Sequence, residues 1–196
     1  MSVLWLLAAL GCRAAPAVSD AESAADTGSV TEEDADTRAD DRTLEEVTVS
    51  LVDASSWVEV DASLDPFSDR PADVSCTALG YGPELDTFEV QTADCAYGTF
   101  RQPLLFDVRA GEEIVVVYWF LELFSTDLDA EGHVALAVDD GLLFEDHIPI
   151  PGGPETRQRT VTAPRDLVAG EWLYFHVHNH GFNSWYLGIV QADAWM

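Results

Sequence analysis

The chain has 196 residues, enough for one domain with additional segments, and 47% of them are apolar, enough for a buried core. It carries 36 acidic and 9 basic residues, all of the basic ones Arg, and its formal net charge is −27. Nucleic acids are bound through Lys and Arg that neutralise phosphates, so this charge excludes nucleic-acid binding and favours cations as partners.

The N-terminus begins with an apolar run from Val3 to Leu10. It is too short to span a bilayer, which takes about 20 apolar residues, and is typical of a secretory signal. Ala9-Leu10-Gly11-Cys12 resembles a bacterial lipobox, although Leu is usual where Ala9 stands. We therefore expect residues 1–12 to hold a signal peptide and lipobox, with Cys12 lipidated and the protein anchored in the bacterial cell envelope. The lipid anchor would be its only contact with a membrane. The protein would lie at the outer membrane, in the periplasm or at the cell surface.

A second processing site leaves another possibility open. Ala15-Pro16-Ala17 has the A-x-A pattern of signal-peptide cleavage, which would remove Cys12 and release a soluble secreted protein.

Residues 13–46 have a different composition from the rest of the chain. They contain 11 acids and 3 Arg and almost no large apolar side chain. Such a segment cannot bury enough surface to offset its conformational entropy, and charge repulsion extends it. We expect a disordered acidic linker that holds a folded domain away from its anchor, with an acidic interaction tail as the alternative.

Residues 47–196 consist of short apolar runs separated by Gly, Pro and Asp. Val, Ile, Tyr, Phe and Trp are frequent in these runs, and no stretch has a helical period. We expect an all-β fold, a jelly-roll-like β-sandwich of about 8–10 strands. The predicted strands are residues 47–53, 57–60, 87–92, 104–109, 113–121, 133–138, 142–148, 157–163, 171–179 and 184–192. The Asp139-Asp140-Gly141 turn between two of them predicts a hairpin.

The remaining cysteines, Cys76 and Cys95, are expected to form a disulfide in an oxidising compartment. Two buried free thiols are the alternative. A two-cysteine metal site is disfavoured because the chain has no C-x-x-C motif.

Three segments resemble the bacterial pre-peptidase C-terminal domain and related jelly-roll modules of secreted enzymes. They read LLFDVRAGEEIVVV (104–117), VALAVDDGLLF (134–144) and LVAGEWLYFHVHNHGFNSWYLGIV (167–190). The resemblance spans about residues 104–190 and rests on turn and strand patterns. It implies a small β-sandwich, commonly an accessory binding module, sometimes with calcium. The cysteine pair, the Pro-rich loop at 149–154 and the histidine run depart from it.

The predicted strand at 171–179 has two distinct faces. Alternate residues of a strand share a face, so Leu173, Phe175 and Val177 are expected to face the core. His176 and His178 then lie on the opposite face, pointing outward or into a groove.

The histidine run is a candidate transition-metal site. Residues at i and i+2 are about 6.6 Å apart on a strand. On a straight strand the three histidines His176, His178 and His180 therefore cannot converge on one zinc ion, which needs nitrogens at about 2.0–2.1 Å. The sequence predicts a zinc or copper site on His176 and His178, completed by His133, by His147, or by His180 where the chain bends. The alternatives are surface or hairpin histidines hydrogen-bonded to Asn or backbone, and pH sensing without a metal.

Residues 127–132 resemble the start of a calcium loop. Asp127, Asp129 and Glu131 stand at alternate positions before Gly132. Val138 occupies the place of the final Glu of an EF-hand, which excludes that motif. A calcium site in a sandwich loop stays open, and a solvated acidic loop is the alternative.

No catalytic residue is predicted, because the chain lacks the nucleophile-elbow, phosphate-loop and zinc-protease motifs. The main expectation is a non-enzymatic binding or surface-structural module, with a protein or carbohydrate partner. The alternatives are a copper- or zinc-binding protein or metalloenzyme centred on His176 and His178, and calcium-dependent binding of carbohydrate or protein.

Overall fold

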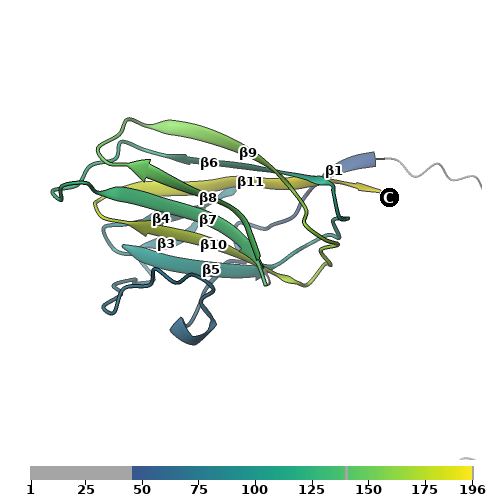
Figure 1. Ribbon diagram of the computed structural model, residues 1–196, viewed down its shortest axis with the longest axis horizontal. Coiled ribbons are helices and arrows are strands. Elements are labelled where there is room, and N and C mark those ends of the chain that lie inside the picture. The colour runs from purple at the N-terminus through teal and green to yellow at the C-terminus, as the bar shows by residue number, and fades with distance from the viewer. Residues whose placement is uncertain (1–45, 140, 196) are drawn as a thin grey trace, which may run out of the picture. The chain divides into compact units, whose positions relative to one another are not determined.

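The structure is a computed structural model that describes residues 46–139 and 141–195. These residues form two antiparallel sheets stacked face to face, as Figure 1 shows. Sheet A contains, in spatial order, β3 (Tyr81–Glu84), β4 (Thr87–Gln91), β11 (Ser184–Trp195), β6 (Glu113–Phe120) and β9 (Glu155–Thr162), with β1 (Glu46–Ser50) paired to the last part of β11. Sheet B contains β2 (Val58–Glu59), β5 (Tyr97–Pro103), β10 (Trp172–Asn179), β7 (Glu131–Val138) and β8 (Gly141–Pro149).

The core lies between the two sheets and is built by alternation along the strands. In β6 every second side chain, from Ile114 to Phe120, is buried. In β10 the side chains of Leu173, Phe175 and Val177 are at most 1% exposed and belong to the core, as their spacing predicted. The all-β sandwich is therefore confirmed.

The strand prediction was wrong in two places. Residues 104–109 form an irregular segment whose only strand-like pairing is one isolated bridge between Val108 and Leu167. The apolar side chains of Leu104 and Val108 are nevertheless buried in the core, which explains their spacing in the sequence. The structure has instead β3 and β5, which bring the strands of the described residues to eleven. In β5, Tyr97, Gly98, Thr99 and Phe100 are all buried in succession, so no alternation marked this strand.

Strands β7 and β8 pair with each other, as the predicted hairpin requires. Val138 pairs with Gly141, and the antiparallel register continues to Glu131 and Pro149.

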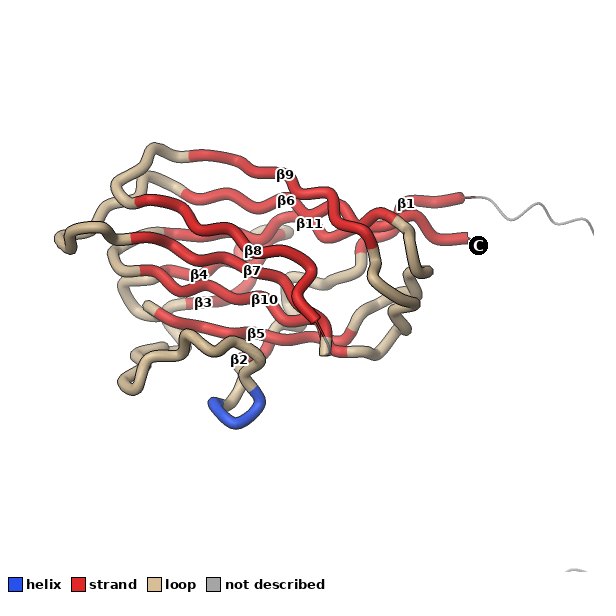
Figure 2. The backbone as a smooth tube through the Cα atoms, in the orientation of Figure 1, coloured by secondary structure: helices blue, strands red, loops and turns tan. Residues whose placement is uncertain are grey.

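Residues 61–76, named here the covering segment, lie against the outer face of sheet B. The segment includes a short 3-10 helix, Ala62–Leu64, drawn in blue in Figure 2. It leaves the sheet after Val60, whose N–H donates to the carbonyl of Thr99. At its other end the predicted disulfide joins Cys76 to Cys95, just before β5. Both ends of the covering segment are thus fixed beside β5.

The predictions for the N-terminus, namely the signal peptide and lipobox at 1–12, Cys12 and the acidic linker at 13–46, lie outside the described residues apart from Glu46. Within the part of the chain that the structure describes, no helix is long and apolar enough to cross a membrane.

Candidate metal centre

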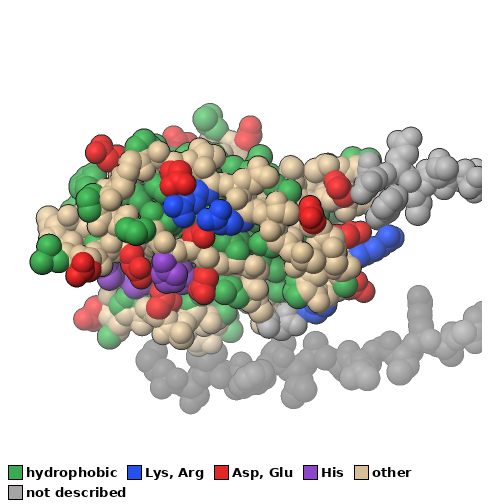
Figure 3. Space-filling view, turned by 45° about the horizontal axis from the view of Figure 1, so that its top comes forward, with side chains coloured by type: hydrophobic (Ala, Val, Ile, Leu, Met, Phe, Trp, Pro, Cys, Tyr) green, Lys and Arg blue, Asp and Glu red, His purple; other side chains and the backbone are tan. Residues whose placement is uncertain are grey.

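Strand register brings histidines from distant parts of the chain into one row. On the outer face of sheet B, His178 of β10 pairs with His133 of β7, which pairs in turn with His147 of β8. His176 precedes His178 by two residues and lies on the same face of β10. The fifth histidine, His180, comes directly after β10. Histidine side chains form a patch on the face of the molecule shown in Figure 3.

The covering segment buries part of this row. Phe67 stacks on the His176 ring with centroids 4.3 Å apart. Beneath it His176 is 0% exposed and His133 is 8% exposed. His176 thus lies on the outer face of the sheet, as expected, but it does not reach solvent, because a segment without strand pattern covers it.

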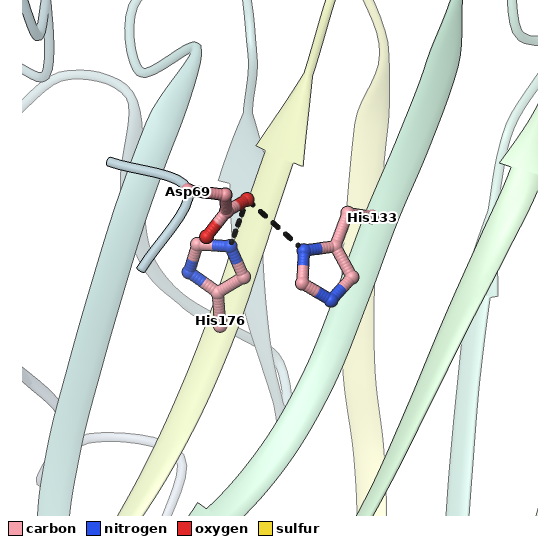
Figure 4. A group of neighbouring side chains, drawn as sticks. All are labelled: Asp69, His133 and His176. Carbon is pink, nitrogen blue, oxygen red and sulfur yellow. Dashed lines mark hydrogen bonds and ion pairs between the residues drawn. The ribbon is translucent and has the colours of Figure 1, made fainter. Parts of the chain in front are cut away.

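One carboxylate oxygen from the covering segment faces two of these histidines (Figure 4). Asp69 Oδ2 lies 3.2 Å from His133 Nδ1 and 3.6 Å from His176 Nε2. The ligand atoms of the three residues all lie within 4.8 Å of one another. In a tetrahedral site with zinc–ligand distances of 2.0–2.2 Å, neighbouring ligand atoms are about 3.3 Å apart. The two distances from Asp69 are close to this value, and the three ligand atoms are near enough for one ion to lie between them.

A chain of hydrogen bonds determines that the His176 nitrogen facing Asp69, Nε2, is the unprotonated one. The Thr99 hydroxyl donates its proton to Asp65 Oδ1 at 3.0 Å, so it accepts from Nδ1–H of His176 at 2.9 Å. In the neutral ring Nε2 then carries no proton, and it is buried without a hydrogen-bond partner. A buried lone pair facing a carboxylate is an arrangement that a cation between them would satisfy.

The charge state of His176 is the one that a metal ligand requires. Burial lowers the pKa of the His176 imidazole more than its neighbouring carboxylates raise it. His176 is therefore neutral, as in metal coordination.

His178 and His180 occupy the rim rather than the buried group. His178 Nδ1 lies 2.9 Å from Asp69 Oδ2, so it orients this carboxylate, and its Nε2 lies 3.2 Å from Nε2 of His180. Neither residue belongs to the sets of described residues whose ligand atoms converge. A cavity of about 170 Å³ lies at this rim and is lined by Asp69, Glu131, His133, His147, His178 and His180.

The residues of the predicted calcium loop are not brought together. Asp127 and Asp129 are exposed, and neither belongs to a convergent set among the described residues. Glu131 is directed to His147, whose Nδ1 lies 3.1 Å from its carboxylate. The calcium site thus stays a prediction.

No protein-family model and no curated protein sequence matches the chain. Among solved structures it is similar to a carbohydrate-binding module studied for mannan recognition, with 13% identity over 76% of this chain and 98% of that one and a TM-score of 0.42. It is also similar to an adhesin domain of Lys-gingipain from Porphyromonas gingivalis w83, with 15% identity, 75% and 99% coverage and a TM-score of 0.40.

A third similar structure is a carbohydrate-binding module of Cellvibrio mixtus lichenase 5A in complex with cellotriose, at 16% identity, 76% and 96% coverage and a TM-score of 0.37. The resemblance to the pre-peptidase C-terminal domain has no family match, and only its β-sandwich architecture is confirmed. The architecture of this chain follows from its own strand pairing, and its chemistry from its own side chains.

Proposed function

We propose that this β-sandwich is a metal-binding module in which Asp69, His133 and His176 hold one zinc ion. The observation that carries the proposal is the buried Nε2 of His176, which has no hydrogen-bond partner and faces the Asp69 carboxylate. Thr99 and Asp65 orient the ring behind it, as outer carboxylates and hydroxyls orient histidines in metal sites.

The donor set supports zinc and leaves one coordination position open. Two imidazoles and a carboxylate are three of the ligands of an open tetrahedral zinc site. The cavity at the rim borders both Asp69 and His133, so water or a small ligand could complete the coordination there. Copper competes for the same donors, because imidazole sites bind Cu²⁺ more tightly than Zn²⁺. Both ions therefore belong in the test.

The experiment is a titration of chelator-treated full-length protein with Zn²⁺ and with Cu²⁺, by calorimetry and by thermal unfolding. An ion that binds only the folded state raises the melting temperature. Asp69→Asn is the decisive variant, because it removes a ligand charge from a side chain that is 37% exposed, so the fold is expected to survive. We expect it to lose tight binding and the thermal shift.

Two variants control for charge and for histidine number. Asp73→Asn removes a carboxylate from the same covering segment, and His180→Ala removes a rim histidine; both are expected to keep tight binding. In the competing arrangement Nδ1–H of His133 donates a hydrogen bond to Asp69 and no metal is bound. In that case neither ion would change the melting temperature of the parent protein, and the proposal would be abandoned.

We also propose that the module lies outside the cytoplasm and is anchored at Cys12. The Cys76–Cys95 disulfide supports export, because such bonds persist in oxidising compartments. The test is membrane fractionation of a Cys12→Ser variant, with mass spectrometry of the mature N-terminus. A variant that stays with the membrane fraction would exclude lipidation at Cys12.

A further inference from the structure

The second ring nitrogen of His133 also faces a carboxylate. Its Nε2 is buried, makes no hydrogen bond, and lies 3.5 Å from Glu145 Oε2 of the neighbouring strand β8. The His133 side chain is 10% exposed, so solvent does not satisfy this nitrogen freely. The proposed zinc would use Nδ1 of the same ring and thus leaves Nε2 available.

His147 adds a third ligand on this side. It pairs directly with His133 across β7 and β8, and the two rings stack with centroids 4.4 Å apart. Glu131 accepts a hydrogen bond from Nδ1–H of His147 at 3.1 Å, which in the neutral ring leaves Nε2 with its lone pair. Ligand atoms of His133, Glu145 and His147 all lie within 4.8 Å of one another.

We infer that the rim holds a second divalent transition-metal ion, bound by His133 Nε2, Glu145 and His147, with His133 bridging the two ions. The inference rests on the proposed zinc site, because that ion occupies the other nitrogen of the bridge. When the second ion binds, a metal–nitrogen bond replaces the N–H bond at Nε2, and the released proton goes to water. The bridging ring becomes an imidazolate.

Charge balance supports two ions. The carboxylates of Asp69, Glu131 and Glu145 and the imidazolate of His133 together supply four negative charges around the cluster. Two divalent cations neutralise them. In a domain with 25 acids and 6 Arg over residues 47–196, no excess of basic side chains competes for these carboxylates.

The two proposed metal sites differ in how firmly their ligand side chains are held before an ion binds. His176 is fully buried and fixed by Thr99, whereas the side chains of His147 and Glu145 are both 50% exposed. The rings of His133 and His147 are parallel within 5°, so His147 must turn before its nitrogen and that of His133 point at one ion. Ordering these exposed side chains costs conformational entropy, so the rim ion binds second and more weakly.

The test counts metal ions in the full-length protein and in two rim variants. Zinc titration followed by elemental analysis is expected to give two ions per chain in two steps, and one ion in Glu145→Gln and in His147→Ala. Glu122→Gln, which alters an exposed side chain that does not line the cavity, is expected to keep two. One ion in the parent protein would overturn the second site and leave the proposed function intact; no ion would overturn both.

A spectroscopic measurement tests the bridge itself. With two Cu²⁺ ions bound through one imidazolate, magnetic coupling lowers the electron paramagnetic resonance intensity below that of two isolated ions. The His147→Ala protein with one Cu²⁺ is expected to show the full intensity of one ion. Full, uncoupled intensity from a two-copper parent protein would overturn the bridging role of His133.

Discussion

The hydroxyl oxygen of Thr99 lies 2.9 Å from Nδ1 of His176, directly across the β5–β10 pair. Because this hydroxyl gives its proton to the Asp65 carboxylate, it can only accept one from the imidazole. The Asp65 carboxylate does not contact the proposed metal, but through Thr99 it determines that Nε2 of His176 is the nitrogen free to bind it.

Thr99→Val is expected to weaken zinc binding by about 10–100-fold, the usual effect of losing a partner that orients a ligand. The change preserves the shape of the side chain but leaves Nδ1 of His176 without an acceptor. Competition with a chelator of known affinity measures it. Thr99→Ser keeps the hydroxyl and should retain most of the affinity; equal affinities for the Val and Ser proteins would contradict the orienting role.

Asp65→Asn should destabilise the metal-free protein by about 3 kcal/mol, because removing one partner of a buried ion pair leaves its donors unmatched. The Asp65 side chain is 1% exposed and accepts from Tyr97, Thr99 and Arg70. Urea unfolding measures the change. Asp73→Asn, at an exposed position of the same segment, should stay within about 0.5 kcal/mol of the parent.

The hydrogen bonds of the tyrosine hydroxyls lead us to expect a loss of folding stability at high pH. All five donate their hydroxyl proton to a carboxylate, in the pairs Tyr81–Glu59, Tyr97–Asp65, Tyr118–Asp146, Tyr174–Asp139 and Tyr186–Glu89. Burial and the bond to Glu89 raise the pKa of Tyr186 to about 12, and burial raises the pKa of each of the others above its ordinary value.

A raised folded-state pKa stabilises the protein below the unfolded value of about 10, and this contribution is lost as the pH rises through the folded-state pKa. We expect the free energy of unfolding to fall above pH 10 and tyrosinate absorbance to appear only above that pH. The same titration in concentrated denaturant should have its midpoint near 10. A native midpoint at or below the denatured one would be incompatible with these hydrogen bonds.

Replacing both Cys76 and Cys95 by Ser should lower the free energy of unfolding by about 3 kcal/mol, the chain-entropy value for a loop of this size. The two residues are separated by 19 positions. Zinc affinity should fall as well, because Asp69 belongs to the segment that the bond fixes. Denaturant unfolding and zinc titration of the double variant measure both effects. An unchanged zinc affinity would mean that the rest of the segment's contacts already place Asp69.

Gly132→Ala tests the contact beneath His133. A Cβ at Gly132 would lie 2.4 Å from Cζ2 of Trp185, a fully buried residue of the opposite sheet. Overpacking of this kind costs about 1–3 kcal/mol, and β7 must shift to relieve it. We expect lower stability together with weaker zinc binding. Gly153→Ala meets nothing within 4 Å and serves as the control.

The sequence predicted one strand of the candidate site well. Alternation placed Leu173, Phe175 and Val177 in the core and His176 on the other face, because side-chain direction in a strand follows from position alone. The same geometry excluded three ligands from one strand, and His133 was among the completing residues considered.

Asp69 and Thr99 could not be found in this way. Asp69 is one of 36 acids and comes from a segment with no periodic pattern, so nothing local distinguishes it. Thr99 lies in β5, a strand buried on both faces at this point and therefore without alternation. The row from His178 through His133 to His147 depends on strand register, which is set by pairing between segments far apart in the chain.

The proposed ligands come from two kinds of structure. His133 and His176 stand on central strands of sheet B, whereas Asp69 comes from the covering segment. Exchange of the ion would therefore require only that this segment lift, with the sandwich intact. The rate of metal release would then depend on the restraints that hold the segment down, the disulfide at Cys76 and the stacking of Phe67, and would be independent of the global rate of unfolding.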